Sequence, residues 1–194
     1  MQIGRVVILC LLALQAACAG GSTIHAGPAP AQPIAPGVTL TLPDNPPFGN
    51  EVGAVQLVQA RYRSMHQIFQ STIESSSDHF IVAMTVPSGP GIMRMDWSHG
   101  VIAAKREPIA PESLSAARML ADLMFVYAPA DVLRKSLDGG EFVTMGERSR
   151  TVFRNGRPVV QVTLPAGDVW NGHATLVNYA FDYTIDIQSR RVSP

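Results

Sequence analysis

The sequence predicts an α+β fold in which a long antiparallel sheet is interrupted midway by a helical pair that covers its concave face. Three observations favour this fold. Apolar and polar residues alternate in most of the segments before residue 107, which is the period of strands with one buried face. Apolar residues then recur at three- and four-residue spacing up to residue 127, and the alternating pattern returns from residue 141 onward.

The strands before the helices are expected to form an antiparallel meander. The domain opens with "VTLTLP" at residue 38, and "QLVQARYRSMHQIFQSTIES" then alternates over a long span. Residues 79–86 and 91–97 are predicted as two further strands because the turn sequence "PSGPG" separates them. The segment "GVIAAKREP" follows the turn Ser98-His99-Gly100 as the last strand of this half.

Two helices are expected in the middle of the chain. The first lies in "PESLSAARMLADLMFVY", where Ser113 can cap its start. Its apolar positions at helical spacing are Leu114, Ala117, Leu120, Leu123, Met124 and Tyr127. A second, short helix is expected to begin at Pro129, because a proline at the first helical position loses no hydrogen bond, and to end at Asp138-Gly139-Gly140.

The rest of the chain is again predicted as sheet. The candidate strands are "EFVTMGER", "RTVFRNGRPVVQVTL", "HATLVNY" and "FDYTIDIQS". Asn155-Gly156 is the strongest hairpin signal in the chain, since both residues accept the positive φ that a type I′ turn requires.

Residues 1–17 have the pattern of a secretory signal peptide. Arg5 precedes an entirely apolar run, and small residues then lead to Cys18. As a helix, residues 6–17 would rise about 18 Å, well short of the ~30 Å that a membrane-spanning segment needs. Ala16-Ala17 before Cys18 resembles a bacterial lipobox, although Gln15 stands where a branched apolar residue is usual. We therefore expect a lipidated Cys18; the alternative is an ordinary secretory signal that is cut nearby.

The expected organisation after the signal is a tether followed by one domain. Residues 18–37 would be the lipidated cysteine and a flexible tether, because Gly, Ala and Pro dominate and few large apolar groups offset the entropy of ordering. Residues 38–194 would form a single domain without a disulfide, since Cys10 and Cys18 both precede it. The lipobox resemblance implies the outer membrane, because Ala19 stands where an aspartate would suggest retention at the inner membrane.

The polar residues favour neither nucleic-acid binding nor catalysis. Fifteen basic residues balance 15 acidic ones without a run of Lys or Arg, so a nucleic-acid partner is disfavoured. The five histidines are scattered, and none has metal-ligand spacing. A Gly-x-Ser-x-Gly element, a phosphate loop and a dinucleotide glycine motif are all missing from the sequence. We expect a protein that is not an enzyme and needs no metal or other cofactor.

The sequence offers a set of soft apolar side chains as its candidate binding site. Methionine adapts its shape and suits sites that accept variable apolar ligands such as acyl chains. The candidate liners are Phe80, Met84, Met93, Met95, Leu120, Leu123, Met124 and Tyr127. The alternative is that these residues fill an ordinary core, and a cavity between sheet and helices would decide in favour of binding.

Several segments together resemble the bacterial lipoprotein family known as domain of unknown function 3261, DUF3261. They are the helix end Phe125-Val126-Tyr127-Ala128-Pro129, the basic strand with its Asn-Gly turn and valine-rich strand, the element Trp170-Asn171-Gly172, and Tyr183 in the last strand. Many members have a tryptophan where this chain has Ala128. The resemblance rests mainly on residues 113–189 and on packing patterns.

The resemblance implies a fold and a role. The family is similar in layout to the lipoprotein receptor LolB and the carrier LolA, which are antiparallel half-barrels with helices in the concave face and an apolar cavity for acyl chains. It implies a lipoprotein on the periplasmic face of the outer membrane that binds or helps to place acyl-chain ligands, whether lipoprotein, fatty-acid-like or aryl polyene. The alternatives are an adaptor lipoprotein that docks an envelope protein partner without a ligand, and an envelope enzyme that acts on acyl products.

Overall fold

The computed structural model describes residues 23–28, 31–49, 51–111 and 114–192. In this part of the chain, 11 strands form one antiparallel sheet in the order β1-β8-β7-β6-β5-β4-β14-β13-β12-β11-β10. They are β1 (Thr23–Pro28), β4 (Val52–Tyr62), β5 (Met65–Ser75), β6 (His79–Thr85), β7 (Gly91–Ser98), β8 (Val101–Arg106), β10 (Glu141–Met145), β11 (Ser149–Arg154), β12 (Arg157–Thr163), β13 (Gly172–Asn178) and β14 (Tyr183–Arg191). A smaller sheet joins β2 (Gln32–Ala35), β3 (Val38–Leu40) and β9 (Leu137–Asp138).

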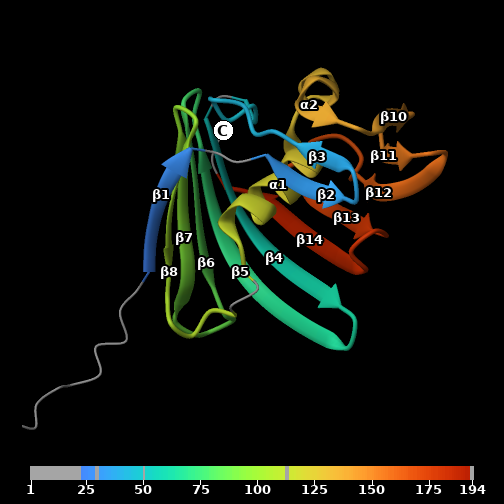
Figure 1. Ribbon diagram of the computed structural model, residues 1–194. Helices are drawn as coiled ribbons and strands as arrows, with labels where there is room; N and C mark the ends of the chain where they lie inside the picture. Colours follow the sequence, from blue (N-terminus) through green and yellow to red (C-terminus); the bar gives the residue numbers. More distant parts are fainter. Residues whose placement is uncertain (1–22, 29–30, 50, 112–113, 193–194) are drawn as a thin grey trace, which may run out of the picture.

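The predicted antiparallel sheet with a helical pair in mid-chain is confirmed in outline. The large sheet is open and strongly curved (Figure 1), and the two helices of the described residues, α1 (Ala116–Tyr127) and α2 (Ala130–Ser136), come between β8 and β10 in the chain. The two meanders become one sheet because β4 pairs with β14, from Tyr62 opposite Tyr183 to Ala54 opposite Arg191. This long-range pairing places strands from both halves of the chain next to each other.

The long alternating segment of residues 56–75 is a hairpin of two strands. β4 ends at Tyr62, β5 begins at Met65, and these two residues are opposite each other in the ladder. Arg63 has a φ of 52°, which supplies the left-handed turn that a two-residue hairpin loop requires. The turn residues, Arg63 and Ser64, are not the Asn or Gly that normally mark such a turn. The sequence therefore does not show where the first strand ends and the second begins.

A flexible tether was expected for residues 18–37, but the structure has strands within this range: β1 (Thr23–Pro28) and β2 (Gln32–Ala35). β1 pairs along β8, from Thr23 opposite Arg106 to Pro28 opposite Val101. Ile34 and Ala35 of β2 are buried, and the side-chain amide of Asn178 donates to the Ile34 carbonyl at 2.9 Å. Backbone pairing to a sheet edge needs no large side chains, which is why a Gly-, Ala- and Pro-rich composition was misleading here.

The N-terminal predictions concern a part of the chain that is not described. The expected signal peptide, residues 1–17, and the expected lipidation site Cys18 lie outside the described residues. Among the residues that are described, none of the helices has the length and apolar character needed to span a membrane.

The first helix starts later than predicted. Ser115 is its N-cap and its Oγ accepts from the backbone N–H of Arg118 at 3.4 Å, whereas Ser113 lies outside the described residues. The helix stops before Pro129 because a residue that precedes a proline is driven out of the helical region, and Ala128 has extended φ and ψ. Pro129, the predicted first helical residue, is the N-cap of α2, so this helix begins one position later than predicted, at Ala130.

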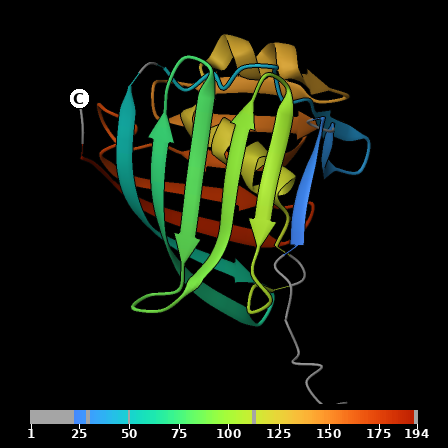
Figure 2. The same ribbon diagram turned by 90° about the vertical axis from the view of Figure 1, so that its left-hand side faces the viewer.

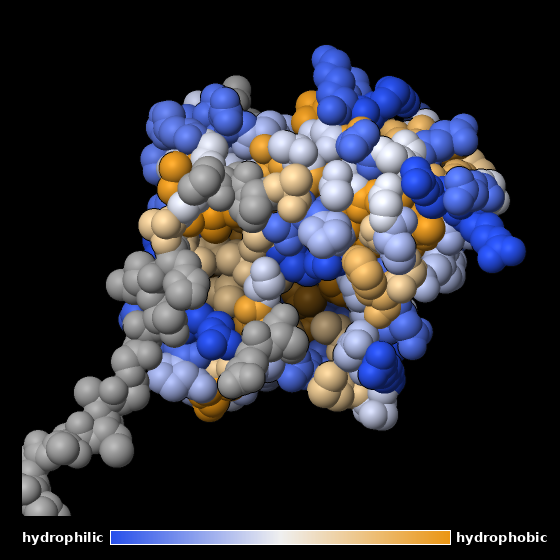
Figure 3. Space-filling model, in the orientation of Figure 1, coloured by the Kyte–Doolittle hydropathy of each residue, from blue (hydrophilic) through white to orange (hydrophobic). Residues whose placement is uncertain are grey.

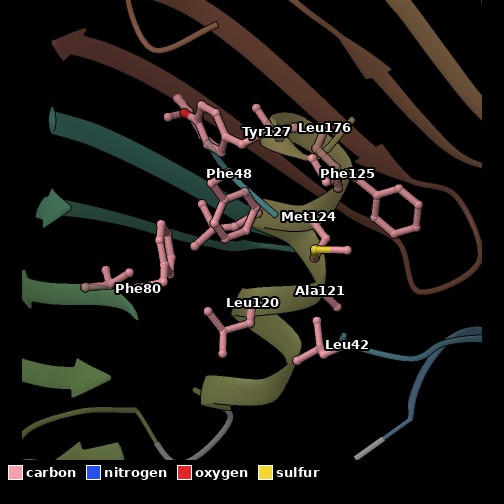
Figure 4. Packing of buried hydrophobic residues seen from close by; sticks show 14 of the residues in the cluster. Leu42, Phe48, Phe80, Leu120, Ala121, Met124, Phe125, Tyr127 and Leu176 are labelled. Carbon is pink, nitrogen blue, oxygen red and sulfur yellow. The ribbon is translucent and has the colours of Figure 1, made fainter. Parts of the chain in front are cut away.

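α1 is buried around its whole circumference in its second half, since every residue from Leu120 to Tyr127 is buried. A helix that is surrounded in this way packs against more than one layer. Figure 4 shows Phe48, Phe80 and Leu120 on one side of α1 and Phe125 on the other.

α2 lies beside β10, where the Arg134 guanidinium is 5.7 Å from the centre of the Phe142 ring. In the view of Figure 2, α1 lies behind the strands of the first half of the sheet.

Candidate functional site

A cavity of about 630 Å³ lies between the N-terminal half of α1 and the large sheet. Its sheet side carries Val58, Ala60, Phe69, Met84 and Ile185, from β4, β5, β6 and β14. Met119 lines it from α1. Figure 3 shows a hollow with hydrophobic residues at its floor in the part of the surface where α1 and β4 meet. Its volume falls within the range of roughly 300–1,000 Å³ that is typical of pockets for one small ligand.

A smaller cavity of about 60 Å³ lies next to the larger one, between α1 and the sheet. Both cavities share Val58, Met84, Met119 and Asp122, so they adjoin each other. The smaller cavity is also lined by Leu123, Leu176 and Ile187. The smaller cavity therefore lies on the inner side of the larger one, against the same apolar side chains.

Strand alternation determines which side chains reach this space. Gln56, Val58 and Ala60 occupy alternate positions of β4 and face α1, whereas Val55 is 40% exposed on the opposite face. In the neighbouring strand, Ile185 is opposite Ala60 and contributes to the same wall. Small and medium side chains at these positions leave the room that a well-packed core would fill.

The structure brings only part of the predicted liner set to the cavities. Met84 lines both of them and Leu123 lines the smaller one. Phe80, Met95, Leu120 and Met124 each have an exposed fraction of 0% and pack in the core, as Figure 4 shows for the first and the last two. Met93 is buried opposite Met84 in the β6–β7 ladder. The ligand-binding role of the whole set stays a prediction.

Sequence reasoning missed several residues that line the larger cavity, above all Val58, Ala60, Ile185, Arg118 and Asp122. The alternation in β4 and β14 identifies an inward-facing row on each strand, but nothing local indicates that these two strands are neighbours. A charged pair at i and i+4 on the expected helix was the available signal for Arg118 and Asp122.

Asp122 is a buried carboxyl group at the junction of the two cavities. It is 8% exposed, and Tyr183 Oη donates to its Oδ1 at 2.7 Å. Burial raises the pKa of Asp122 to about 7, although the Tyr183 hydrogen bond and the charge of Arg118 act in the opposite direction. Burial and the neighbouring carboxyl group both raise the pKa of the Tyr183 phenol, so this phenol stays a donor.

Three arginines line the larger cavity, and their surroundings differ. The Arg118 guanidinium is 4.7 Å from the centre of the Phe181 ring, and its Nη1 is buried without an acceptor among the described residues. Arg61 forms an ion pair with Asp186. The Arg63 guanidinium is 5.1 Å from the centre of the Tyr62 ring at the end of the β4–β5 hairpin.

A buried polar network holds the C-terminal end of α1 to the sheet. Gln56 Nε2 donates to Tyr127 Oη at 2.6 Å and to Ser189 Oγ at 3.0 Å, and the two hydroxyl groups are 2.7 Å apart. Ser71 Oγ donates to Gln56 Oε1 at 3.1 Å. Burial raises the pKa of Tyr127 to about 12, so it is a neutral member of this network. Tyr127 thus anchors the C-terminal end of α1 to the sheet, beyond the inner end of the cavity.

The described residues contain no group of three or more His, Cys, Asp and Glu side chains that could hold a metal ion. What the arrangement offers chemically is a largely apolar chamber whose lining also includes two carboxyl groups, those of Asp122 and Asp182, and three arginines. Such a chamber can take up an apolar chain and orient its polar end.

The comparison with curated proteins gave no match. Among solved structures, a LolA superfamily protein from Nitrosomonas europaea is similar to this chain at 10% sequence identity and a TM-score of 0.43, over 76% of this chain and 86% of that one. The family described as "Protein of unknown function (DUF3261)" matches residues 53–191, which is more than half of the sequence. This chain therefore belongs to the DUF3261 family.

Proposed function

We propose that this protein binds an acyl chain, or a similar unbranched apolar chain, between α1 and the large sheet. The observation that carries this proposal is the cavity of about 630 Å³, whose wall is formed by Val58, Ala60, Met84, Met119 and Ile185. Methionine at two of these positions allows the wall to adapt to chains of different length. Hydrophobic burial needs no catalytic group, and the proposed role is that of a carrier and not an enzyme.

The energy available from such a site is sufficient for useful affinity. Burial of a chain of about 14 methylenes at ~0.8 kcal/mol each would contribute close to 11 kcal/mol. The costs of immobilising the chain and of moving side chains are subtracted from that figure. A dissociation constant in the micromolar range needs ~8 kcal/mol, so a site that retains most of the burial energy meets the requirement.

In this proposal the helical pair closes the concave face of the sheet, and α1 is the part that contacts the ligand. Tyr127 and Asp122 link α1 to the sheet through hydrogen bonds to Gln56 and Tyr183, so α1 can hold a fixed distance from the sheet while the space between stays open. The ligand would enter at the end where the β4–β5 hairpin and the start of α1 meet.

The proposed place of action is the periplasmic face of the outer membrane, with Cys18 as the lipid anchor. A thioether-linked diacyl group together with a further acyl chain would give stable attachment, since more than one chain is needed for anchoring that does not reverse quickly. An anchored protein with an acyl-chain site would receive or place lipids at that membrane.

The experiment is native mass spectrometry of the protein purified from the envelope of bacteria that make the native lipids, followed by solvent extraction of anything bound. The proposal predicts a stoichiometric adduct with the mass of an acyl or polyene compound. A clean mass without an adduct, from folded protein, would contradict it and would favour an adaptor that docks an envelope partner. Capture of that partner by cross-linking would then be the decisive next step.

A further inference from the structure

The polar end of the larger cavity contains a cation with an unsatisfied donor. Arg118 lies on α1 one turn before Asp122, and both residues line the cavity. Its Nη1 atom is buried, yet it has no hydrogen-bond acceptor among the described residues. A buried donor that belongs to a charged group is costly to leave unpaired, so this nitrogen has a strong demand for an acceptor.

Stacking on Phe181 holds the Arg118 guanidinium beside the cavity. The guanidinium carbon is 4.7 Å from the centre of the Phe181 ring, and stacking on an aromatic face restricts the side chain. Phe181 is itself a cavity residue, in the turn before β14. The side chain is thus preorganised beside the apolar wall and does not extend freely into solvent.

The neighbouring carboxyl group does not fully neutralise Arg118. The Oδ1 atom of Asp122 accepts a hydrogen bond from Tyr183 at 2.7 Å, and burial holds the pKa of Asp122 at about 7. Burial favours the neutral form of this carboxyl group, so Asp122 offsets less of the positive charge of Arg118 than an exposed aspartate would.

The outer rim of the cavity carries charged groups of both signs. Arg61 and Arg63 lie on the hairpin side of the opening, and the only acidic residue that joins them in the described lining, apart from Asp122, is Asp182. Arg61 is also engaged with Asp186, so Arg63 is the freer of the two cations. Arg63, which forms no ion pair among the described residues, can attract an anion toward the opening, and it does so less at high salt.

We propose that the ligand of this cavity is a single-chain amphiphile with an anionic head, a carboxylate or a phosphate, which accepts a hydrogen bond from Arg118. Its tail would lie along Val58, Met84 and Met119 toward the smaller cavity. This inference rests on the proposed function, because it assumes that the cavity takes an apolar chain, and it adds the chemical class of the head group.

The test compares four amphiphiles that share a 16-carbon chain: palmitate, hexadecyl phosphate, hexadecanol and hexadecyltrimethylammonium. Each is titrated below its critical micelle concentration into the full-length protein by displacement of a neutral fluorescent acyl probe. The variant is Arg118→Gln, which keeps a polar side chain of similar reach. Arg134→Gln is the matched control, because Arg134 also stacks on a phenylalanine ring of this chain, on α2 rather than at the cavity.

The expected result is that palmitate or hexadecyl phosphate binds about 10- to 100-fold more tightly than hexadecanol, as one charge-assisted hydrogen bond would give. Arg118→Gln should remove this preference and leave hexadecanol binding unchanged, and Arg134→Gln should change neither. Equal binding of all four amphiphiles, or a preference that survives in Arg118→Gln, would overturn the head-group inference while the acyl-chain function stands. If the folded wild-type protein binds none of them, the proposed function fails as well.

Discussion

The rings of Tyr127 and Trp170 are stacked, with their centroids 3.8 Å apart and their planes inclined by 8°. Trp170 lies in the turn before β13, and Phe48 contacts it edge-on with a centroid distance of 6.2 Å. The hydroxyl group of the same tyrosine takes part in the network with Gln56 and Ser189. The end of α1 is therefore held by its ring on one side and by its hydroxyl group on the other.

Removal of this hydroxyl group by Tyr127→Phe separates the two contributions, because the ring stack is kept. Gln56 Nε2 loses one of its two acceptors, so we expect the free energy of unfolding to fall by about 1–2 kcal/mol. Urea denaturation followed by circular dichroism measures this change. Tyr179→Phe is the control, since Tyr179 is 50% exposed and donates to Gln161 at the surface. Equal losses of unfolding free energy in both variants would show that the buried hydrogen bonds of Tyr127 stabilise the protein no more than the exposed one of Tyr179.

Strands were predictable from the sequence where one face is buried and the other is exposed to solvent. β6 alternates along its length, with Phe80, Val82 and Met84 buried between more exposed residues, and it was found with nearly correct bounds. The Asn155-Gly156 hairpin was also found, and both residues have the expected positive φ, 52° and 72°. In these elements the local sequence pattern favours the same strand or turn that the tertiary packing requires.

The elements that sequence reasoning missed depend on distant partners. β1 is a strand because the edge of β8 is available to it, and its own side chains do not indicate this. The cavity wall depends on the pairing of Ala60 with Ile185, two residues far apart in the chain. A set of liners chosen for residue type alone included Met95 and Met124, which the structure places in the core. Packing and not composition decides which methionines line a space.

Asp122 makes stability depend on pH in an unusual direction. Its pKa is raised from 3.8 to about 7 in the folded protein, so the folded state binds the proton more tightly than the unfolded state does. The stabilisation is complete below pH 4 and is lost as pH rises through 7, and its size is at most roughly 4 kcal/mol. The free energy of unfolding should therefore fall between pH 5 and pH 8 by more in the wild type than in Asp122→Asn.

The measurement for this prediction is urea denaturation of both proteins at several pH values in that range. Asp122→Asn should be more stable than the wild type at pH 8, because a neutral amide replaces a buried charge and can still accept from Tyr183. Asp131→Asn on the exposed surface of α2 serves as the control. Parallel pH profiles for the wild type and Asp122→Asn would rule out a role of this carboxyl group.

A bulkier side chain at Val58 should block the cavity. Val58→Phe places the larger ring in a space that is already open, so we expect acyl-probe binding to weaken by tenfold or more while the protein stays folded. Val55→Phe is the matched control, because Val55 is on the same strand but 40% exposed on the other face. Fluorescence titration gives the affinity and circular dichroism the folding. Unchanged binding in Val58→Phe would place the ligand elsewhere.

The proposed anchor is testable independently of the ligand. Cells that express the protein and receive radiolabelled palmitate should incorporate the label, and Cys18→Ser should abolish it and release the protein from the membrane fraction. Cys10→Ser, inside the expected signal peptide, should retain the label. If Cys18→Ser is still labelled or still sediments with membranes, then Cys18 is not the anchor.

Photocross-linking with a palmitic acid that carries a diazirine near its methyl end tests the central claim most directly, since it reports where the chain lies. After irradiation and proteolysis, mass spectrometry should find the label on residues at the junction of the two cavities, Val58, Met84 and Met119. Unlabelled palmitate should compete for that site. Labelling confined to the outer face of the sheet, around Val55 and Leu57, or labelling that does not saturate, would contradict the existence of an acyl-chain site between α1 and the sheet.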